Sequence, residues 1–397
     1  MSGQSSTSGS SGDLVRIGIV GLGAAGRAFL PAIQAHPGLK LVAIADPEVQ
    51  VRDGISEPGV TAYATLQEML AHPGLDAVYI ATPTDLHPEH VELACASKKH
   101  VLVEKPMATD IGQAARMIAA AEQAGVQLVV GHSHSYDLPI KRMRELIAGG
   151  TLGRVRMVNT WCFTDWIYRP RRPEELDATL GGGVTYRQGS HQFDIIRLLC
   201  GGMVQSVRAR TFDWDPERRA IGAHVAYLDF ADGAAATAVY NGYGSFSSMD
   251  LCFNVSEWGF MQPPESRTAV GRPAPGSTPE AELRAKQQRA KNAIPGSAPY
   301  QPFFGLTLVS CERGDIRQSP RRLYVHTSDG QTEIVLPADQ SPRDLVMAEF
   351  HAAISGLAPA LHDGRWGLAN LEVCAAAIAS SASGQDVVLQ HQVPVAA

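Results

Sequence analysis

The 397-residue chain lacks the patterns that mark several classes of protein. No apolar run approaches the ~20 residues that a membrane span needs. The net charge is −6 and no long basic run is present, which argues against a nucleic-acid partner. The six cysteines (95, 162, 200, 252, 311 and 374) have neither CxxC nor Cys/His spacing, which argues against a zinc site and a disulfide framework. We therefore expect a soluble protein of the reducing cytoplasm, without membrane, nucleic-acid or metal partners.

Residues 1–13 also lack the basic start and the apolar stretch of a signal peptide, and their Ser/Gly composition predicts a flexible tail. The whole chain is 45% hydrophobic and 19% charged, as expected for a globular enzyme with sizeable cores. Its length suggests two domains, which we place at 14–134 and 135–397.

In the first of these domains, apolar runs alternate with helical patterns. The runs are V-R-I-G-I-V, L-V-A-I-A-D, A-V-Y-I-A-T, H-V-L-V-E-K and Q-L-V-V-G-H, and helical spacing is found at 26–35, 66–71, 88–97 and 111–124. Apolar strands separated by helices predict a parallel sheet that is covered on both faces. We therefore expect an α/β fold that begins with a Rossmann-like, doubly wound domain.

The second half is richer in strands. After a helix at 139–148 come strand-like runs such as R-V-R-M-V-N-T-W-C-F and H-V-A-Y-L-D-F, and Asp232-Gly233 predicts a hairpin turn. Helices are expected at 186–199 and near 368–381. This pattern predicts an α+β domain with a mainly antiparallel sheet. Residues 263–299 are rich in Pro, Gly and Ser around a charged helical piece at 279–293, and we expect a surface excursion, either a lid or an oligomer arm.

The first apolar run leads directly into Gly21-Leu22-Gly23-Ala24-Ala25-Gly26. In a G-x-G-x-x-G motif between strand and helix, the first glycine forms the tight turn and the second lets the backbone approach a pyrophosphate. The third lets the helix pack on the strand. The helix N-terminus then faces the anion with its partial positive charge. This segment therefore predicts a dinucleotide-binding site.

Four further residues are expected around that cofactor. Asp46 ends the second apolar run, where a carboxylate accepts hydrogen bonds from the adenosine ribose and repels a 2′-phosphate, so NAD is favoured over NADP. Asp46 is alternatively a simple turn former before Pro47. Thr82 and Pro83 follow the third run and are expected to line the cofactor channel, whereas His87 is either a cofactor contact or a helix-entry residue.

The fourth run ends in Glu104-Lys105-Pro106. We expect Glu104 and Lys105 to lie against the cofactor, because open α/β sheets bind ligands at the carboxyl ends of their strands. Desolvation and a nearby nicotinamide cation would lower the pKa of Lys105 and make it a usable acid or base. The alternative is an ordinary exposed lysine in a turn.

Taken together, G-x-G-x-x-G, the strand-end Asp, A-T-P-T-x-x-H and V-E-K-P resemble the Gfo/Idh/MocA oxidoreductase family. Residues 181–194, G-G-G-V-T-Y-R-Q-G-S-H-Q-F-D, resemble the family's substrate-helix motif. The resemblance implies an N-terminal dinucleotide fold and Lys105 and His191 at the reacting carbon. It also implies a C-terminal open-faced sheet used in oligomerisation, so we expect a homo-oligomer, a dimer or a tetramer.

One position departs from this pattern, because Arg187 stands where the family usually has an Asp four residues before the His. On a helix the positions i and i+4 share a face, so Arg187 and His191 are expected to look into the same pocket. A guanidinium is suited to grip a substrate carboxylate with two hydrogen bonds. The alternative is that Arg187 pairs with a carboxylate of the protein: Asp194, Asp165 or Glu174.

A second cluster agrees with an anionic substrate. The segment D-W-I-Y-R-P-R-R interleaves Trp166 and Tyr168 with arginines, of which Arg169 is the expected substrate contact, and Gln188 is expected beside Arg187. Together with G-D-I-R-Q-S-P-R at 314–321, these motifs resemble the family's dehydrogenases of carboxylated arene cis-dihydrodiols, such as those from phthalate or 3-chlorobenzoate. Three arginines in one loop are alternatively a solvated surface.

This resemblance implies NAD-dependent oxidation of a ring-carboxylated cis-dihydrodiol, such as phthalate 4,5-cis-dihydrodiol or a chlorobenzoate-derived one, to a catechol. Lys105 is the expected base and His191 its orienting or relaying partner, with no metal required. One alternative is a sugar or inositol dehydrogenase of the same family. The other is a dinucleotide-binding sensor without turnover, which would have no need of a lysine at a strand end.

Overall fold

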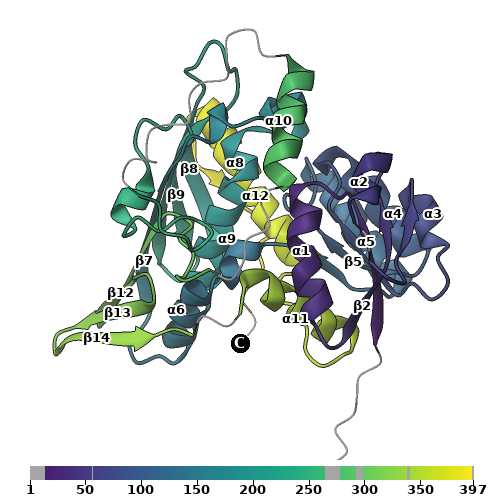
Figure 1. Cartoon of the computed structure of the whole chain (residues 1–397). Helices are drawn as coiled ribbons and strands as arrows, with labels where there is room; N and C mark the ends of the chain where they lie inside the picture. Colours follow the sequence, from purple (N-terminus) through teal and green to yellow (C-terminus); the bar gives the residue numbers. More distant parts are fainter. Residues whose placement is uncertain (1–13, 56, 264–277, 292–297, 338–339, 396–397) are drawn as a thin grey trace, which may run out of the picture.

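The computed structural model describes residues 14–55, 57–263, 278–291, 298–337 and 340–395. Within them the chain forms two β-sheets with helices packed on and between them (Figure 1). The first sheet has the strand order β3-β2-β1-β4-β5-β6, and all its pairs are parallel. Its strands are β1 Val15–Val20, β2 Leu39–Ala45, β3 Thr61–Tyr63, β4 Ala77–Ile80, β5 His100–Val103 and β6 Leu128–Val130.

Helices cover both faces of this sheet, which confirms the predicted doubly wound fold. They are α1 Ala24–Ala35, α2 Val49–Asp53, α3 Leu66–Leu70, α4 His87–Ala96 and α5 Ile111–Ala124. One further helix comes from much later in the chain: α11 (Pro342–Ile354) packs beside α1, and its Val346, Met347 and Phe350 share a core cluster with Phe29 and Ile33. The domain boundary predicted at residue 134 stays a prediction. By its sequence position α11 belongs to the predicted second domain, but it packs against α1 of the first.

The second sheet is mixed, with the order β14-β13-β12-β11-β7-β10-β9-β8-β15. Its pairs are antiparallel except for β7 with β10, which confirms a mainly antiparallel sheet. The strands are β7 Val155–Phe163, β8 Val204–Phe212, β9 Ala223–Phe230, β10 Ala235–Asn241, β11 Leu306–Cys311, β12 Gly314–Gln318, β13 Arg322–Thr327, β14 Gly330–Val335 and β15 Val387–Val388. The predicted hairpin turn joins β9 to β10, with Gly233 in the left-handed region.

In the described part of the chain, helices cover one face of the second sheet. Helices α6 (Leu138–Ala148), α9 (Gly189–Leu199) and α12 (Gly364–Ser383) lie on its inner side, and α12 also touches α5 and β6, so it lies between the two sheets (Figure 1). On the outer face the side chains of Met157, Trp161, Val225 and Tyr227 are exposed by 43–47%. The sheet is therefore open on that side.

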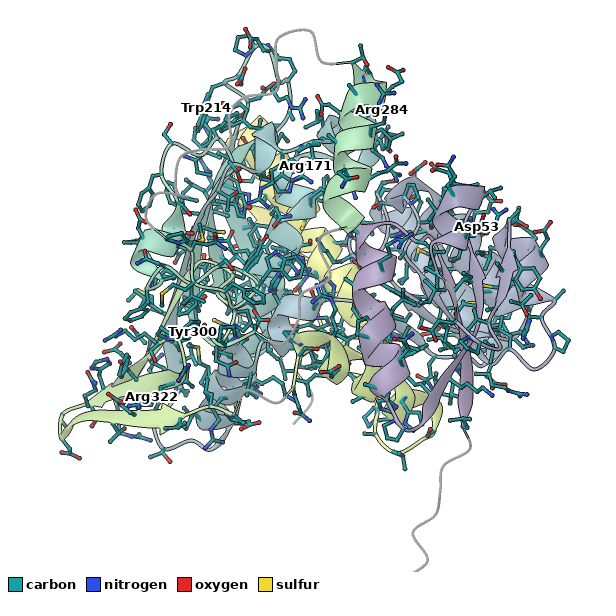
Figure 2. The ribbon with its side chains drawn as sticks, in the orientation of Figure 1. Asp53, Arg171, Trp214, Arg284, Tyr300 and Arg322 are labelled. Atoms are coloured by element: carbon teal, nitrogen blue, oxygen red, sulfur yellow. The ribbon has the colours of Figure 1, made fainter. Side chains whose placement is uncertain are left out.

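The remaining helical elements connect the strands and helices given above. They are α7 Pro173–Leu176, α8 Gly183–Arg187, α10 Pro279–Lys291 and the 3₁₀ turns Thr84–Leu86, Ser133–Tyr136, Trp166–Tyr168, Ala178–Leu180 and Ser248–Leu251. Most of the predicted excursion 263–299 lies outside the described residues, but α10 within it is described. Figure 2 shows Arg171 next to α10, and the Arg171 backbone N–H donates to Glu282 of that helix at 2.9 Å. No helix among the described residues is long and apolar enough to span a bilayer.

The helix predicted at 186–199 is not continuous, and this prediction was wrong in one respect. The helical segment breaks at Gln188, where α8 ends and α9 begins. In the first turn of α9, the His191 N–H donates to the Gln188 carbonyl at 3.1 Å, three residues before it, so the Arg187 carbonyl is left for another donor. Gly189 follows the break, and a Cβ there would lie 3.1 Å from the His224 ring on β9. Its missing side chain lets the start of α9 come this close to the sheet.

Candidate active site

The carboxyl ends of four neighbouring parallel strands carry the predicted site residues. Gly21 follows β1, Thr82 follows the end of β4, Lys105 follows β5, and a histidine-rich turn follows β6. The break between α8 and α9 faces this edge, since the Lys105 ammonium reaches the Arg187 carbonyl. The topology therefore brings together residues that are far apart in the sequence.

The three motif glycines differ in their surroundings as the motif predicts. Gly21 has a φ of +87°, and a Cβ on it would lie 2.6 Å from the Ala81 carbonyl oxygen. A Cβ on Gly26 would lie 2.0 Å from the Gly21 carbonyl oxygen, so only glycine lets α1 approach β1 here. A Cβ on Gly23 would meet no atom within 4 Å. Gly23 therefore keeps space open rather than avoiding a clash within the protein.

The N-terminus of α1 suits an anion. Gly23 caps the helix without a side-chain hydrogen bond, and the first turn has no acidic residue. Leu22 is buried, whereas Gly23 and Ala24 are exposed and Ala25 is partly exposed. The open backbone N–H groups and the helix dipole fit a pyrophosphate, so the residues present suit a dinucleotide.

Asp46 lies against the glycine-rich loop. Its Oδ2 accepts from the Leu22 N–H at 2.8 Å and its Oδ1 from the Glu48 N–H at 3.0 Å. The second bond is the turn expected of an Asp before Pro47, and the first links Asp46 to the cofactor loop. Sequence reasoning missed two arginines here: Arg27 donates to the Leu22 carbonyl at 2.9 Å, and Arg52 donates to the Asp46 carbonyl.

His87 connects two loops of the predicted site. It is 1% exposed, its Nε2 lies 2.9 Å from the Thr82 carbonyl oxygen, and its Nδ1 lies 3.1 Å from the Pro106 carbonyl oxygen. Burial lowers the pKa of His87 to about 4, and the two carbonyl contacts oppose this shift. Pro83 precedes the 3₁₀ turn that leads to His87. The histidine holds the Thr82 loop to the residue that follows Lys105, and a direct cofactor contact stays a prediction.

Lys105 follows β5 and reaches the break between α8 and α9. Its Nζ donates to the Arg187 carbonyl oxygen at 2.9 Å. Burial lowers the pKa of Lys105 to about 8, with Glu104 opposing this and Arg187 adding to it. Burial also raises the pKa of Glu104, whose Oε1 accepts from the Tyr79 hydroxyl at 2.6 Å. Lys105 therefore differs from an ordinary exposed lysine in a turn.

His191 is 5% exposed and lies among other rings. Its centroid is 4.5 Å from that of His134 and 5.2 Å from that of Phe304. Burial lowers the pKa of His191 well below its usual range, and Lys105 and His134 act in the same direction. Its Nδ1 is buried and has no hydrogen-bond partner among the described residues. The ring is therefore neutral.

Arg187 differs from the arginines around it in its partners. Its Nη1 donates to the Thr84 hydroxyl at 3.0 Å, and its Nε is buried without a partner among the described residues. The neighbouring cations have carboxylate partners: Arg169 with Asp165 and Glu257, Arg171 and Lys286 with Glu175, Arg172 with Glu174, and Arg218 with Glu282. In the described part of the chain, no carboxylate lies within 4.0 Å of the Arg187 side-chain nitrogens.

The other predicted substrate contacts are mostly engaged within the protein. Trp166 is 1% exposed, with the Arg171 guanidinium 3.9 Å from its ring centroid. The Tyr168 hydroxyl donates to Asp215 at 2.9 Å. Arg169 donates to Asp165 at 2.7 Å, and although burial opposes this, Glu257 and Asp165 raise its pKa. Their roles toward a substrate stay predictions, as does that of Gln188 at the helix break.

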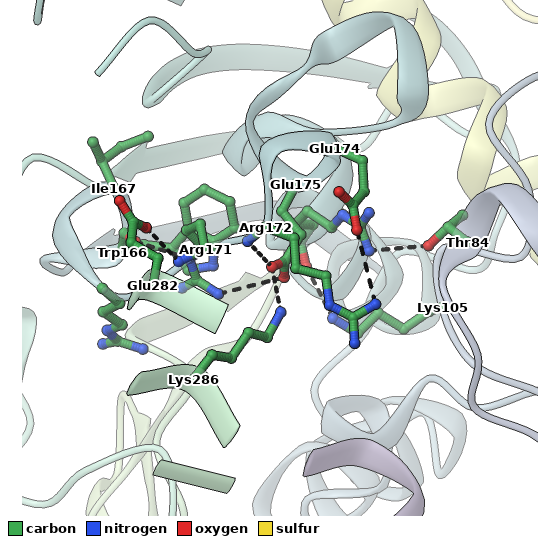
Figure 3. A network of polar contacts seen from close by, with 12 residues as sticks. Thr84, Lys105, Trp166, Ile167, Arg171, Arg172, Glu174, Glu175, Glu282 and Lys286 are labelled. Carbon is green, nitrogen blue, oxygen red and sulfur yellow. Dashed lines mark hydrogen bonds and ion pairs between the residues drawn. The ribbon is translucent and has the colours of Figure 1, made fainter. Parts of the chain in front are cut away.

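Helix α10 contributes two side chains to this group of charged residues. Its Lys286 pairs with Glu175, and its Glu282 accepts from Arg218 at 2.7 Å (Figure 3). On its other side, the Gln287 amide donates to Glu48 at 3.2 Å, two residues from Asp46. The helix thus touches both the substrate-side arginines and the expected ribose end. No group of His, Cys, Asp and Glu able to hold a metal is found among the described residues.

The fold and this strand-end site define an oxidoreductase with an NAD-binding Rossmann domain, and the chain belongs to the GFO/IDH/MocA family. Residues 15–132 match the model described as "Oxidoreductase family, NAD-binding Rossmann fold", and residues 140–274 match that of the "GFO/IDH/MocA C-terminal domain". These matches confirm the family expected from the motifs.

Individual relatives agree with this assignment. The chain is 37% identical over 371 residues to a 1-carboxy-3-chloro-3,4-dihydroxycyclohexa-1,5-diene dehydrogenase of Comamonas testosteroni, covering 91% of this chain and 94% of that one. A crystal structure from Bordetella bronchiseptica RB50 is similar at a TM-score of 0.84 and 40% identity, covering 94% of this chain and 100% of that one. An Agrobacterium radiobacter oxidoreductase, solved with NAD⁺, L-tartaric acid and magnesium, shares the fold at a TM-score of 0.70 and 19% identity, with coverage of 94% and 98%.

Proposed function

We propose that this protein oxidises a ring-carboxylated cis-dihydrodiol to the corresponding catechol, with NAD⁺ as cofactor. The observation that carries the proposal is Arg187. It is a largely buried cation whose side chain has a hydroxyl partner, Thr84, but no carboxylate partner among the described residues. A buried charge is costly unless it is paired, so a substrate carboxylate is the natural partner.

The position of Arg187 supports this use. Its backbone carbonyl holds the Lys105 ammonium, and its side chain reaches Thr84 on the loop after β4. An anion bound by the Arg187 guanidinium would therefore lie close to the proposed base, because the same residue contacts Lys105 through its carbonyl. The curated relative from Comamonas testosteroni acts, by its name, on a carboxylated dihydroxycyclohexadiene, which agrees with this geometry.

The chemistry divides between two side chains. Bound NAD⁺ would supply the hydride acceptor. Lys105, whose pKa burial lowers to about 8, takes the hydroxyl proton as the carbinol carbon becomes a carbonyl. The resulting hydroxydienone then tautomerises: the remaining sp³ ring carbon loses its proton and the new ketone oxygen gains one, which gives the aromatic catechol.

His191 has a different role in this proposal. It is neutral, and its Nδ1 has no acceptor among the described residues, so the ring proton is best placed on Nε2. A neutral imidazole donates this proton in a hydrogen bond to the reacting oxygen without giving it up. His191 thus orients the substrate hydroxyl while Lys105 accepts the proton.

Two accompanying expectations belong to the same proposal. The Asp46 carboxylate next to the glycine-rich loop favours NAD over NADP, and Arg27 and Arg52 are engaged with backbone carbonyls. The open outer face of the second sheet supports a homo-oligomer assembled through it. The six free thiols fit a reducing compartment such as the cytoplasm.

The test is a substrate panel followed by NADH absorbance. It compares phthalate 4,5-cis-dihydrodiol and 3-chlorobenzoate cis-dihydrodiol with benzene cis-dihydrodiol and myo-inositol, each with NAD⁺ and with NADP⁺. We expect the carboxylated diols to exceed benzene dihydrodiol in kcat/KM by about 10² or more, because a charged hydrogen bond is lost with the latter. Activity on inositol alone would contradict the proposal.

A further inference from the structure

The sequence H-S-H-S-Y-D at 132–137 follows β6, at the same sheet edge as Lys105, and the proposed function leaves it unused. It forms a 3₁₀ turn, Ser133–Tyr136, that leads into α6. Within the turn, His134 Nδ1 lies 3.0 Å from Asp137 Oδ2, and the Asp137 side chain is 2% exposed. The segment therefore contains a carboxylate–imidazole pair on a short, ordered element.

This pair lies directly against His191. The His134 ring meets the His191 ring edge to face, with centroids 4.5 Å apart. Phe304 lies 4.5 Å from His134 and 5.2 Å from His191, so the three rings form one cluster. Because His191 has no hydrogen bond at Nδ1 among the described residues, ring packing is what fixes its orientation.

The His134–Asp137 pair provides a carboxylate–imidazole interaction of the kind that is missing at position 187. The resemblance noted above places a carboxylate four residues before His191, and this chain has Arg187 there. In the described part of the chain no carboxylate pairs with His191. A carboxylate that orients an imidazole is instead found one ring away, on a different structural element.

We propose that His134, anchored by Asp137, is a positioning residue for His191 and replaces the missing helix carboxylate. Asp137 fixes the His134 ring through Nδ1–H, and the His134 ring fixes the plane of the His191 ring. His191 then presents its Nε2–H to the reacting oxygen. This inference rests on the proposed function only in that it assumes a reaction oriented by His191.

The test is a double-mutant cycle between His134→Ala and His191→Ala, run with whichever panel substrate the wild-type enzyme oxidises. We expect His134→Ala to lower kcat by about 10–100-fold, with KM and the Kd for NAD⁺ nearly unchanged. In the His191→Ala background the same change should lower kcat by less than about twofold, because the residue that it positions is absent. Asp137→Asn should resemble His134→Ala and should add little to it.

His391→Ala is the matched control, because His391 pairs with Glu372 at 2.9 Å in the C-terminal segment. We expect it to leave kcat unchanged. An undiminished kcat in His134→Ala, or an equal loss in both backgrounds, would overturn the positioning role. Turnover of inositol alone, with strong coupling in the cycle, would contradict the proposed substrate but support the positioning role. If the wild-type enzyme oxidised no member of the panel, both proposals would fail.

Discussion

The two sides of the site are built from different material. On the sheet side, the predicted cofactor contacts depend on backbone: glycines at defined positions, an uncapped helix N-terminus and carbonyls that His87 contacts. On the facing side, α7, α10 and the loops beside them contribute charged side chains, most of which are paired (Figure 3). The first side is suited to a constant ligand, whereas the second is suited to recognising a particular anion.

The largest expected effect tests the lysine where the two sides meet. Lys105→Met removes the proposed proton acceptor, so kcat should fall by about 10³, while the Kd for NAD⁺ stays within about threefold. Rapid-mixing measurement of NADH formation and fluorescence titration of NAD⁺ would check the two parts. Near-normal turnover would show that another group is the base.

Arg187→Ala tests the facing side. With carboxylated diols, kcat/KM should fall by about 10², because the anion loses its charged hydrogen bonds. With benzene dihydrodiol the loss should be small. Equal losses on both kinds of substrate would instead mark Arg187 as a structural residue.

Arg169→Ala is the matched change for that prediction. Arg169 already pairs with Asp165 and Glu257, so its removal leaves two carboxylates without their cation. We expect a loss of stability of up to about 3 kcal/mol. Chemical denaturation of the two arginine variants would separate these effects.

The pH dependence follows from the lowered pKa of Lys105. The proposed base is the neutral amine, and burial places the pKa of Lys105 at about 8. The rate should therefore rise about tenfold for each pH unit below 7 and level off above pH 9. Lys286 has a similarly lowered pKa of about 8, so Lys286→Met is the control and should retain the same profile. If the pH–rate profile of Lys286→Met differed from that of the wild-type enzyme, Lys286 of α10 rather than Lys105 would be the titrating group.

The last two variants replace glycines and test the backbone side. Gly26→Ala places a Cβ 2.0 Å from the Gly21 carbonyl and should lower the melting temperature by several degrees. Gly23→Ala meets no protein atom within 4 Å and should leave the melting temperature unchanged. It should raise the Kd for NAD⁺ about tenfold by crowding the pyrophosphate. Unchanged NAD⁺ affinity in Gly23→Ala would place the pyrophosphate elsewhere.

Local sequence was sufficient to predict most of the sheet side. The glycine motif and five of the six strands follow from short-range patterns, and the family matches agree with them. The short edge strand β3 and helix α2 were missed, and the order of strands was not predicted. The facing side was harder because it depends on tertiary contacts. The break at Gln188 arises where Gly189 approaches the second sheet, and helical spacing alone does not reveal it.

The pairing of charges was equally beyond the sequence. Nothing in D-W-I-Y-R-P-R-R shows that Arg169 meets Glu257 or that Lys286 reaches Glu175, since these partners lie about 90 to 110 residues away. The His134–Asp137 pair, in contrast, carried an available signal. The turn that carries this pair follows β6, and β6 pairs in parallel with β5, which leads to Lys105. The rule that ligands bind at the carboxyl ends of parallel strands, which identified Lys105, therefore applies to this turn as well.

The hydrogen bond from Lys105 to the Arg187 carbonyl has a consequence for how this scaffold can change. Every amino acid has that carbonyl, so the anchor of the lysine does not depend on which side chain occupies position 187. If Arg187 binds the substrate as proposed, selectivity at this position can be exchanged while the proposed proton acceptor stays anchored. A saturation library at position 187 is a direct route to variants that keep their turnover but accept uncharged or differently charged diols.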